Sequence, residues 1–435
     1  MTTKPLNQLS LTEAINAIEL GDTSAEAIIN ACYDQIDARE PLVSAWQYSL
    51  TREQYLQAYR ANEEFYKNSR LKGLPVGVKD TIDTASMPTE MGSRLHANRQ
   101  PADDASCVAL IQQAGGIVLG KTVTTEFAYF QPGRTANPKH LQHTPGGSSS
   151  GSAAAVADYM VPASLGSQTA ASVIRPAAYC GTVGYVGSCG EFSSRGIQPL
   201  AQSLDSLGFF ARSVDDIVLL RSVLLGNPAT AIGADTEEPV KPTKVLLCPG
   251  SNVGDTDADM NAAMADLAVQ LQHHGIETPE LDSCDLISRL VGNHETVMAY
   301  EVYRNLAVER QYADRLSESF RGLLQEGEST SRADYLAALS NIAITTRWLW
   351  HLHPDVDAIL APAAPGAAPQ GLGSTGKPHM SRPWQAMGLP VITLPGLSNA
   401  AGLPLGVQLI GKSRDDDELL QTARWIHSHI EGLSC

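Results

Sequence analysis

One lysine and two serines are the residues of this sequence whose types and surroundings could carry out a hydrolytic reaction. Lys79 ends the run Gly73-Leu-Pro-Val-Gly-Val-Lys79, which is typical of a strand. A lysine buried at such a place has a lowered pKa and can act as a neutral base. Ser148 and Ser172 lie on either side of an alanine-rich segment, and a serine hydroxyl is a good nucleophile only when a base removes its proton. The alternative for Lys79 taken alone is an ordinary exposed lysine.

The segment around these serines, Leu141 to Gly190, is rich in small residues. Small residues suit places where the backbone approaches another backbone or a ligand closely, and the alternative is a flexible Gly/Ser loop. Gly147-Ser-Ser-Ser-Gly151 also matches the GxSxG nucleophile elbow. That elbow needs a strand directly before it, whereas His143-Thr-Pro-Gly146 is typical of a turn. We therefore do not expect an elbow.

The sequence offers no pattern for a metal or a cofactor. Its histidine pairs lack a third ligand at a recognisable spacing, and HExxH and strand-linked GxGxxG patterns are absent. The Gly/Ser segment also lacks the lysine of a phosphate-binding loop. We expect no metal and no cofactor. The acidic run Asp415–Glu418 is interpreted as the start of a helix, where negative charge is favourable.

Composition excludes several classes of protein. A net charge of −16 disfavours nucleic-acid binding, which needs clustered Lys and Arg. No apolar run approaches the length of a membrane span. The 7 cysteines are scattered without a CxxC pair, and the first ten residues are polar. These features favour a cytoplasmic protein without disulfides, and neither nucleic acid nor membrane is expected as a partner.

Strands and helices alternate through most of the chain. Capping-box patterns at Ser10–Glu13 and Thr23–Glu26 predict two opening helices, and a third is predicted over Thr51–Ser69. The predicted strands are Pro75–Lys79, Gly116–Gly120, Lys244–Cys248, Ala358–Ala361, Val391–Leu394 and Pro404–Ile410. Helices are predicted between them over Ala105–Ala114 and Asn261–His274, and after them over Asp416–His429. This alternation predicts an α/β fold with a mostly buried mixed sheet.

We expect the whole chain, 1–435, to form a single large domain, because no repeat and no long linker interrupts it. Within it, residues 1–70 are predicted to form N-terminal helices, 71–215 the catalytic core, and 285–350 a helical region resembling a cap.

Taken together, these segments resemble the amidase signature family. The resemblance rests on Gly73–Asp80, Pro145–Ala155, Gly166–Gly184, Ser203–Gly208 and Gly402–Gly411. It covers most of the chain from about residue 70 and implies one central mixed sheet with helices on both faces. Within the family, Val78–Gly92, Ser172–Gly181, Ser374-Thr-Gly376 and Trp384–Gly388 are most similar to malonamidases. That similarity also implies a homodimer.

Carried over to this sequence, the resemblance implies a Ser-cisSer-Lys triad. Ser172 is then the nucleophile, Ser148 the bridging serine behind a cis Gly147–Ser148 peptide, and Lys79 the terminal base. The backbone N–H groups of Thr169, Ala170, Ala171 and Ser172 would form the oxyanion hole.

Two features bear on the substrate. The family usually has Gly-Gly or Ala-Gly before the nucleophile, whereas this chain has Ala170-Ala171. If either position needs a positive φ, alanine costs about 1–2 kcal/mol, and the added methyl groups narrow the pocket.

Arg175 follows Ser172 by three positions, as in malonamidases. Its guanidinium could hold a substrate carboxylate, and the alternative is a structural arginine paired with an acid.

The resemblance therefore predicts an amidohydrolase that cleaves small, carboxylate-bearing amides such as malonamate to acid and ammonia, through an acyl-enzyme. Two alternatives stay open. One is hydrolysis of urea-like carboxylated amides of the biuret or allophanate type. The other is an ammonia-liberating component of a tRNA-dependent amidotransferase, which would require a protein partner.

Overall fold

The computed structural model describes residues 4–227, 239–282, 284–430 and 432–433; Cys435 therefore lies outside the described residues. Within these ranges the strands form one 10-stranded sheet in the order β1-β3-β2-β4-β6-β5-β9-β10-β8-β7. The β2/β3, β2/β4 and β7/β8 pairs are parallel, and the remaining neighbours are antiparallel. The predicted fold class, a single α/β domain with a mixed sheet, is confirmed.

The strands are β1 (Trp46–Ser49), β2 (Pro75–Lys79), β3 (Ile117–Thr122), β4 (Ala163–Gln168), β5 (Val183–Val186), β6 (Ser206–Ala211), β7 (Val245–Leu247), β8 (Ala358–Pro362), β9 (Val391–Ser398) and β10 (Pro404–Ile410). The helices are α1 (Leu11–Glu19), α2 (Ala25–Val43), α3 (Arg52–Ala61), α4 (Glu63–Asn68), α5 (Ser106–Gln113), α6 (Ser150–Ala157), α7 (Ile174–Cys180), α8 (Val214–Leu224), α9 (Ala258–His273), α10 (Cys284–Asn305), α11 (Glu318–Ser329), α12 (Arg332–Leu352), α13 (Arg382–Ala386) and α14 (Asp416–His429).

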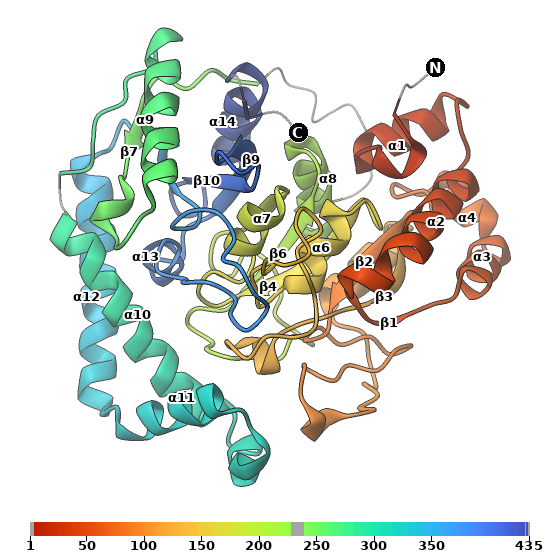
Figure 1. The fold of residues 1–435 in the computed structure, drawn as a ribbon, viewed down its shortest axis with the longest axis horizontal. Coiled ribbons are helices and arrows are strands. Elements are labelled where there is room, and N and C mark those ends of the chain that lie inside the picture. Colours follow the sequence, from red (N-terminus) through yellow and green to blue (C-terminus); the bar gives the residue numbers. More distant parts are fainter. Residues whose placement is uncertain (1–3, 228–238, 283, 431, 434–435) are drawn as a thin grey trace.

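The sheet has an apolar core on each face, because successive strand residues point to opposite sides. On β6, Phe210 belongs to the core that includes α6 and α7, whereas Phe209 belongs to the core that includes α8 and α14. The two faces are thus covered by different helices (Figure 1). None of the helices in the described ranges is long and apolar enough to cross a membrane.

The helices outside these layers form two groups at opposite sides of the sheet. Figure 1 shows α1 to α4 beside β1 and β3, and α10 to α12 on the other side. Helix α10 packs against α11, α12 and α13. The 285–350 region is therefore held together around α10, which also contacts α13 outside that region.

The predicted helices were largely correct, with two local differences. Ser10 forms the expected capping box with Glu13, but the cap of α2 is Ser24, whose side chain accepts the N–H of Ala27, so the box predicted at Thr23 is wrong. The helix predicted over Thr51–Ser69 is interrupted at Asn62, whose φ of −134° is not helical, and becomes α3 and α4.

Strands β4, β5 and β6 lie in the middle of the sheet but were not predicted. Their glycines removed the alternating apolar pattern that marks a strand. The glycines are there because the neighbours are close: a Cβ on Gly184 would lie 2.6 Å from the Ala177 Cβ, and one on Gly208 would lie 2.7 Å from the Tyr185 carbonyl oxygen. Close approach of α7 at Gly184 and of the neighbouring strand β5 at Gly208 therefore accounts for these glycines.

Candidate active site

Lys79 is the last residue of β2 and is completely buried, with 0% of its surface exposed. Its Nζ lies 2.7 Å from the Ser148 Oγ, 3.0 Å from the Ser167 Oγ and 3.1 Å from the Ser167 carbonyl oxygen. Burial lowers the pKa of Lys79 to about 7, against the opposing effect of Asp205. A substantial fraction of this amine is therefore neutral near neutral pH, as a proton acceptor must be.

The backbone directly before Ser148 is packed very closely. The Gly147–Ser148 peptide bond is cis, and Gly146 has a φ of 82°. A Cβ on Gly146 would lie 2.9 Å from the Pro176 Cα, and one on Gly147 would lie 2.8 Å from the Thr375 Cγ2. The glycines of this segment are thus required for close approach, as one interpretation of the sequence predicted.

Ser172 lies in the short connection between β4 and α7 and faces the same pocket as Ser148. The two segments are joined by a hydrogen bond from the Ser149 N–H to the Ser172 carbonyl oxygen, at 3.3 Å. The Ser172 hydroxyl makes no hydrogen bond with any residue that the structure describes, and 7% of the residue is exposed. The structure therefore places Ser148 and Ser172 at one pocket, and Lys79 contacts Ser148 from outside the pocket lining.

The backbone just before Ser172 has unused hydrogen-bond donors. Within the described part of the chain, the N–H groups of residues 169–172 donate to no other residue, whereas those of Val173 and Ile174 donate to the Gln168 Oε1 at 2.9 and 3.1 Å. The Thr169 hydroxyl donates to the Asp205 Oδ1 at 2.5 Å. Asp205 also accepts the N–H groups of Leu200 and Ala201. The contacts to Asp205 and Gln168 therefore hold this segment in place, while the N–H groups of residues 169–172 remain available to a ligand.

Ala170 and Ala171 are not among the residues with a positive φ. The backbone strain that the sequence allowed at these positions therefore does not arise. Both residues line the pocket, so their methyl groups act only on its shape.

Arg175, on α7, is buried and contacts the backbone of the site. Its Nη2 donates to the Gly147 carbonyl oxygen at 2.7 Å and to the Thr375 Oγ1 at 3.1 Å, and its Nη1 donates to the Gly376 carbonyl oxygen at 2.7 Å. Its Nε is buried and has no hydrogen-bond partner among the residues that the structure describes. No carboxylate in the described ranges pairs with it, and burial lowers its pKa to about 10. Of the two predicted roles, pairing with an acid is excluded for the described residues.

The pocket itself is small in this conformation. Its free volume is about 20 Å³, which is enough for roughly one water molecule. Its wall includes Tyr129 and Phe130, Met298 from α10 and Arg382 from α13. Sequence reasoning did not find these residues, because they come from separate segments without any pattern that links them.

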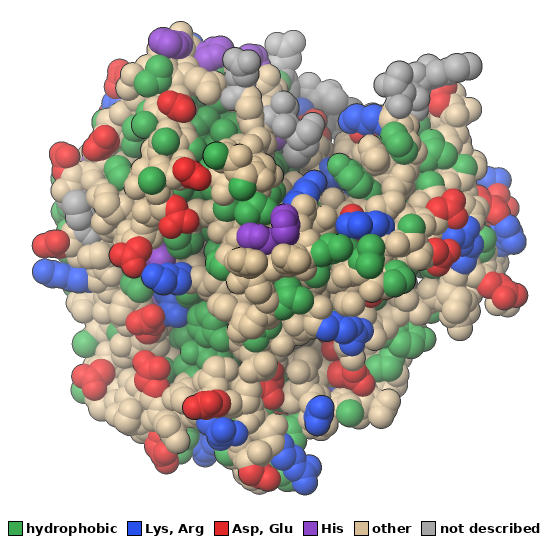
Figure 2. All heavy atoms as spheres, in the orientation of Figure 1, with side chains coloured by type: hydrophobic (Ala, Val, Ile, Leu, Met, Phe, Trp, Pro, Cys, Tyr) green, Lys and Arg blue, Asp and Glu red, His purple; other side chains and the backbone are tan. Residues whose placement is uncertain are grey.

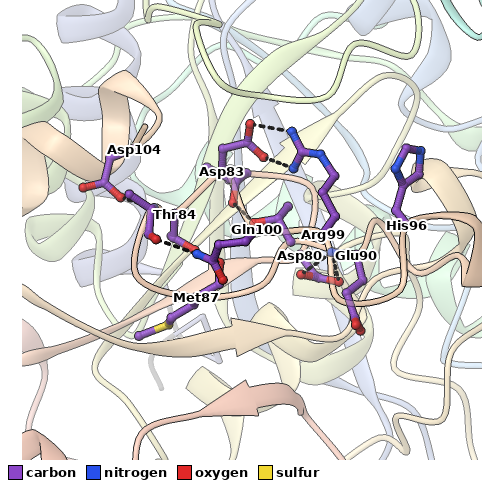
Figure 3. A network of polar contacts seen from close by, with 12 residues as sticks. Asp80, Asp83, Thr84, Met87, Glu90, His96, Arg99, Gln100 and Asp104 are labelled. Carbon is purple, nitrogen blue, oxygen red and sulfur yellow. Dashed lines mark hydrogen bonds and ion pairs between the residues drawn. The ribbon is translucent and has the colours of Figure 1, made fainter. Parts of the chain in front are cut away.

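A polar network holds the segment that follows Lys79 (Figure 3). Arg99 donates to both carboxylate oxygens of Asp83, at 2.7 and 3.0 Å. Asp80 accepts the N–H of Glu90 at 3.2 Å, so two separate contacts tie the loop back to its start. The loop thereby fixes the end of the strand that carries Lys79.

A second buried lysine, Lys121 on β3, belongs to this network and not to the pocket. Its Nζ donates to the Ile82 carbonyl oxygen and to the Thr89 Oγ1, both at 2.6 Å, and lies 3.7 Å from the Asp80 Oδ1. Burial lowers the pKa of Lys121 to about 8, whereas Asp80 acts in the opposite direction. Lys121 thus has a carboxylate partner, which Lys79 lacks among its hydrogen-bond partners.

Comparison with known proteins decides the family. A family model described as Amidase matches residues 27–420. The chain belongs to the amidase family. It is an amide-hydrolysing enzyme of this family, as the sequence predicted.

Relatives of this amidase include components of amidotransferases. One subunit of the glutamyl-tRNA(Gln) amidotransferase from Synechococcus sp. (strain CC9902) is 30% identical, and the match covers 96% of this chain and 95% of that protein. A crystal structure described as an amidase is 26% identical, with a TM-score of 0.85 over 97% of this chain and 99% of that one. The corresponding glutamyl-tRNA(Gln) amidotransferase subunit of Thermotoga maritima is 26% identical, with a TM-score of 0.82 over 100% and 98% of the two chains.

Proposed function

We propose that this amidase hydrolyses small amides that carry a carboxylate, releasing ammonia and an acid through an acyl-enzyme on Ser172. The observation that carries the proposal is the 2.7 Å contact between the Lys79 Nζ and the Ser148 Oγ, at the pocket that the Ser172 side chain also lines. A neutral amine with a serine hydroxyl beside it can accept a proton and pass it back.

The first half of the reaction acylates the enzyme. The Ser172 hydroxyl transfers its proton to the Ser148 Oγ as the Ser148 proton moves to the Lys79 Nζ. The Ser172 Oγ bonds to the amide carbon, and the carbonyl electron pair moves onto oxygen, where the N–H groups of residues 169–172 donate to it. When the carbon–nitrogen bond breaks, the proton returns from Lys79 through Ser148 to the leaving nitrogen, and ammonia departs.

The second half releases the acid. A water molecule gives its proton to the same relay and attacks the acyl carbon. The bond to the Ser172 Oγ breaks, and Ser172 regains a proton from Ser148. The sum is amide plus water to acid plus ammonia, and the proposal requires no other group.

Arg175 supports the carboxylate part of the proposal. It is a buried pocket cation, and its charge has no carboxylate partner in the described ranges. The buried Nε of Arg175 has a hydrogen to donate, and no described residue accepts it. Since the net charge of −16 opposes an anion at long range, recognition of a carboxylate has to be local. On the face seen in Figure 2, acidic and basic side chains are interspersed, which agrees with recognition of a carboxylate by a local contact.

Ammonia release from a panel of amides tests the proposal: malonamate, biuret derivatives, glutamine and uncharged aliphatic amides, with Ser172→Ala as the inactive control. We expect malonamate to be turned over best. Loss of the Arg175 contacts to Gly147 and Gly376 should lower activity on all amides alike. On carboxylated amides, Arg175→Ala and Arg175→Lys should lose about 100-fold more activity than on uncharged ones, because a lost charge-assisted contact to the substrate costs about 1.5–3 kcal/mol. Equal losses on both substrate types would reject the carboxylate role.

A second candidate is an ammonia-liberating component of an amidotransferase. It is favoured by the 30% identity to a subunit of glutamyl-tRNA(Gln) amidotransferase over nearly the whole chain. This candidate predicts glutamine as the preferred substrate and activity that depends on a protein partner. Light scattering of the purified chain, measured together with the panel, separates the two: an isolated homodimer that is active on malonamate excludes the second candidate.

A further inference from the structure

His294 on α10 is buried beside the segment that precedes Ser172, and both of its ring nitrogens are engaged. The residue has 0% of its surface exposed. Its Nε2 lies 2.7 Å from the Thr169 carbonyl oxygen, and its Nδ1 lies 3.4 Å from the Arg382 Nη1. Met298, one turn further along α10, lines the pocket. Helix α10 thus contributes Met298 to the pocket wall and contacts the Thr169 backbone through His294.

The two partners determine the protonation of this histidine. A carbonyl oxygen can only accept a hydrogen bond, and a guanidinium nitrogen can only donate one. The Nε2 of His294 must therefore carry the hydrogen, and the Nδ1 must be the acceptor. Arg382 is itself held by Glu295, with an Nη1–Oε1 distance of 2.8 Å. Burial also lowers the pKa of His294 to about 3, which keeps the ring neutral.

Fixing the Thr169 carbonyl also fixes a neighbouring donor. A trans peptide unit is planar, so the Thr169 C=O and the Ala170 N–H point in opposite directions in one plane. A hydrogen bond to the carbonyl oxygen also polarises the amide and strengthens its N–H as a donor. Within the described ranges, the Ala170 N–H donates to no other residue, and Thr169 and Ala170 both line the pocket.

We propose that His294 is a positioning residue for the oxyanion hole: by donating to the Thr169 carbonyl it aims the Ala170 N–H at the oxygen that becomes negative during attack by Ser172. This inference rests on the proposed function of Ser172. The Thr169 hydroxyl is bound separately by Asp205, so the residue is held at two points, one on the side chain and one on the peptide.

A matched pair of variants tests the proposal. The amide nitrogen of a glutamine can occupy the place of the histidine Nε2, whereas that of an asparagine reaches only the place of Nδ1. We expect His294→Gln to keep kcat within about 5-fold of the native enzyme and His294→Asn to lower it by about 10- to 100-fold, since loss of a whole oxyanion donor costs about 100- to 1,000-fold. The KM should change by less than about 3-fold in both, because the contact acts in the transition state.

A measurement on the native enzyme covers the case in which the asparagine variant does not fold. Carbonyl-13C threonine and 15N alanine labelling selects Thr-Ala peptide units, and the Ala170 amide should shift downfield when a trifluoromethyl ketone substrate analogue forms its tetrahedral adduct with Ser172. An unmoved Ala170 amide in that adduct would overturn the proposal, as would equal kinetics in folded Gln and Asn variants. If the native enzyme hydrolyses no amide of the panel, the proposed function and the role of His294 both fail. Normal turnover in the Asn variant removes only the role of His294.

Discussion

Lys79 contacts Ser167 twice, since its Nζ lies 3.0 Å from the hydroxyl oxygen and 3.1 Å from the carbonyl oxygen of that residue. A neutral amine has two hydrogens and one lone pair. Ser167 offers acceptors for both hydrogens, and the lone pair is then left for the hydroxyl proton of Ser148, at 2.7 Å. The arrangement therefore suits the neutral, proton-accepting form of Lys79.

The first prediction concerns pH. Because burial lowers the pKa of Lys79 to about 7, the base is protonated and inactive below that value, and kcat/KM should rise with pH to a plateau above about pH 8. Lys79→Met should lower kcat by at least about 100-fold, as expected for loss of a general base. Measurement of kcat and kcat/KM against pH, on the best amide of the panel, tests both predictions. A flat profile between pH 5 and 9 would contradict the assignment.

The buried Lys79 should also lower the free energy of unfolding. Its pKa is lower in the folded chain than in the unfolded chain, so between the two values the unfolded state binds more protons, and stability rises with pH. Below about pH 7 the full cost of burying the charge is present. Lys79→Met removes this cost, and we expect the variant to melt at a higher temperature than the native enzyme at pH 6, by an amount that shrinks toward pH 10. Thermal unfolding at several pH values tests this, and a variant that melts lower at every pH would contradict it.

Ser167→Ala is predicted to move the pH profile toward lower pH. The protonated amine donates more strongly to the Ser167 hydroxyl than the neutral amine does, so loss of that hydroxyl favours the neutral form and lowers the pKa of Lys79 further. We expect kcat to fall by about 10-fold because the amine is held by one contact fewer. Ser164→Ala is the matched control: Ser164 lies on the same strand, is buried, and its hydroxyl has no hydrogen-bond partner in the described part of the chain. An identical shift in both variants would reject this role for Ser167.

The site could be predicted from the sequence only where its residues lie in local patterns. Lys79 stands at the end of a recognisable strand, and the glycines near Ser148 indicate close approach; Gly151, for example, would place a Cβ 2.2 Å from the Ala45 carbonyl oxygen. His294 lacks such a pattern. A buried histidine on an amphipathic helix looks the same whether it packs in a core or donates to a distant carbonyl, and its partner Thr169 is 125 residues away in the chain.

The strands, too, could be predicted only where the sequence carries a local pattern. Strands with apolar side chains on both faces, such as β8 and β10, were predicted close to their observed bounds. The central strands β4 to β6 and the edge strand β1 were not predicted. In the central strands, close approach of α7 or of a neighbouring strand requires glycine and removes the periodic signal.

Thr169→Val is predicted to damage both stability and catalysis. The change leaves the Asp205 Oδ1 without the Thr169 hydroxyl in a buried site, and an unsatisfied buried acceptor costs about 1–3 kcal/mol. We expect a lower melting temperature and a fall in kcat, because the segment with the oxyanion N–H groups loses one of its anchors. Thr182→Val serves as the control, since no described residue forms a hydrogen bond with the buried Thr182 hydroxyl. Equal effects of the two changes would show that the Asp205 contact is passive.

The last prediction concerns Ala170 and Ala171. Since neither residue has a positive φ, glycine is not needed for the backbone, and replacing both alanines by glycine should destabilise the protein by about 0.4–1 kcal/mol per site through the greater freedom of the unfolded chain. Both residues line the pocket, whose free volume is only about 20 Å³, so removing the methyl groups should allow amides with larger acyl groups to react. Melting temperature and kcat/KM for a series of amides of increasing acyl size measure the two effects. A loss of stability without any change in size preference would mean that the methyl groups do not limit the substrate.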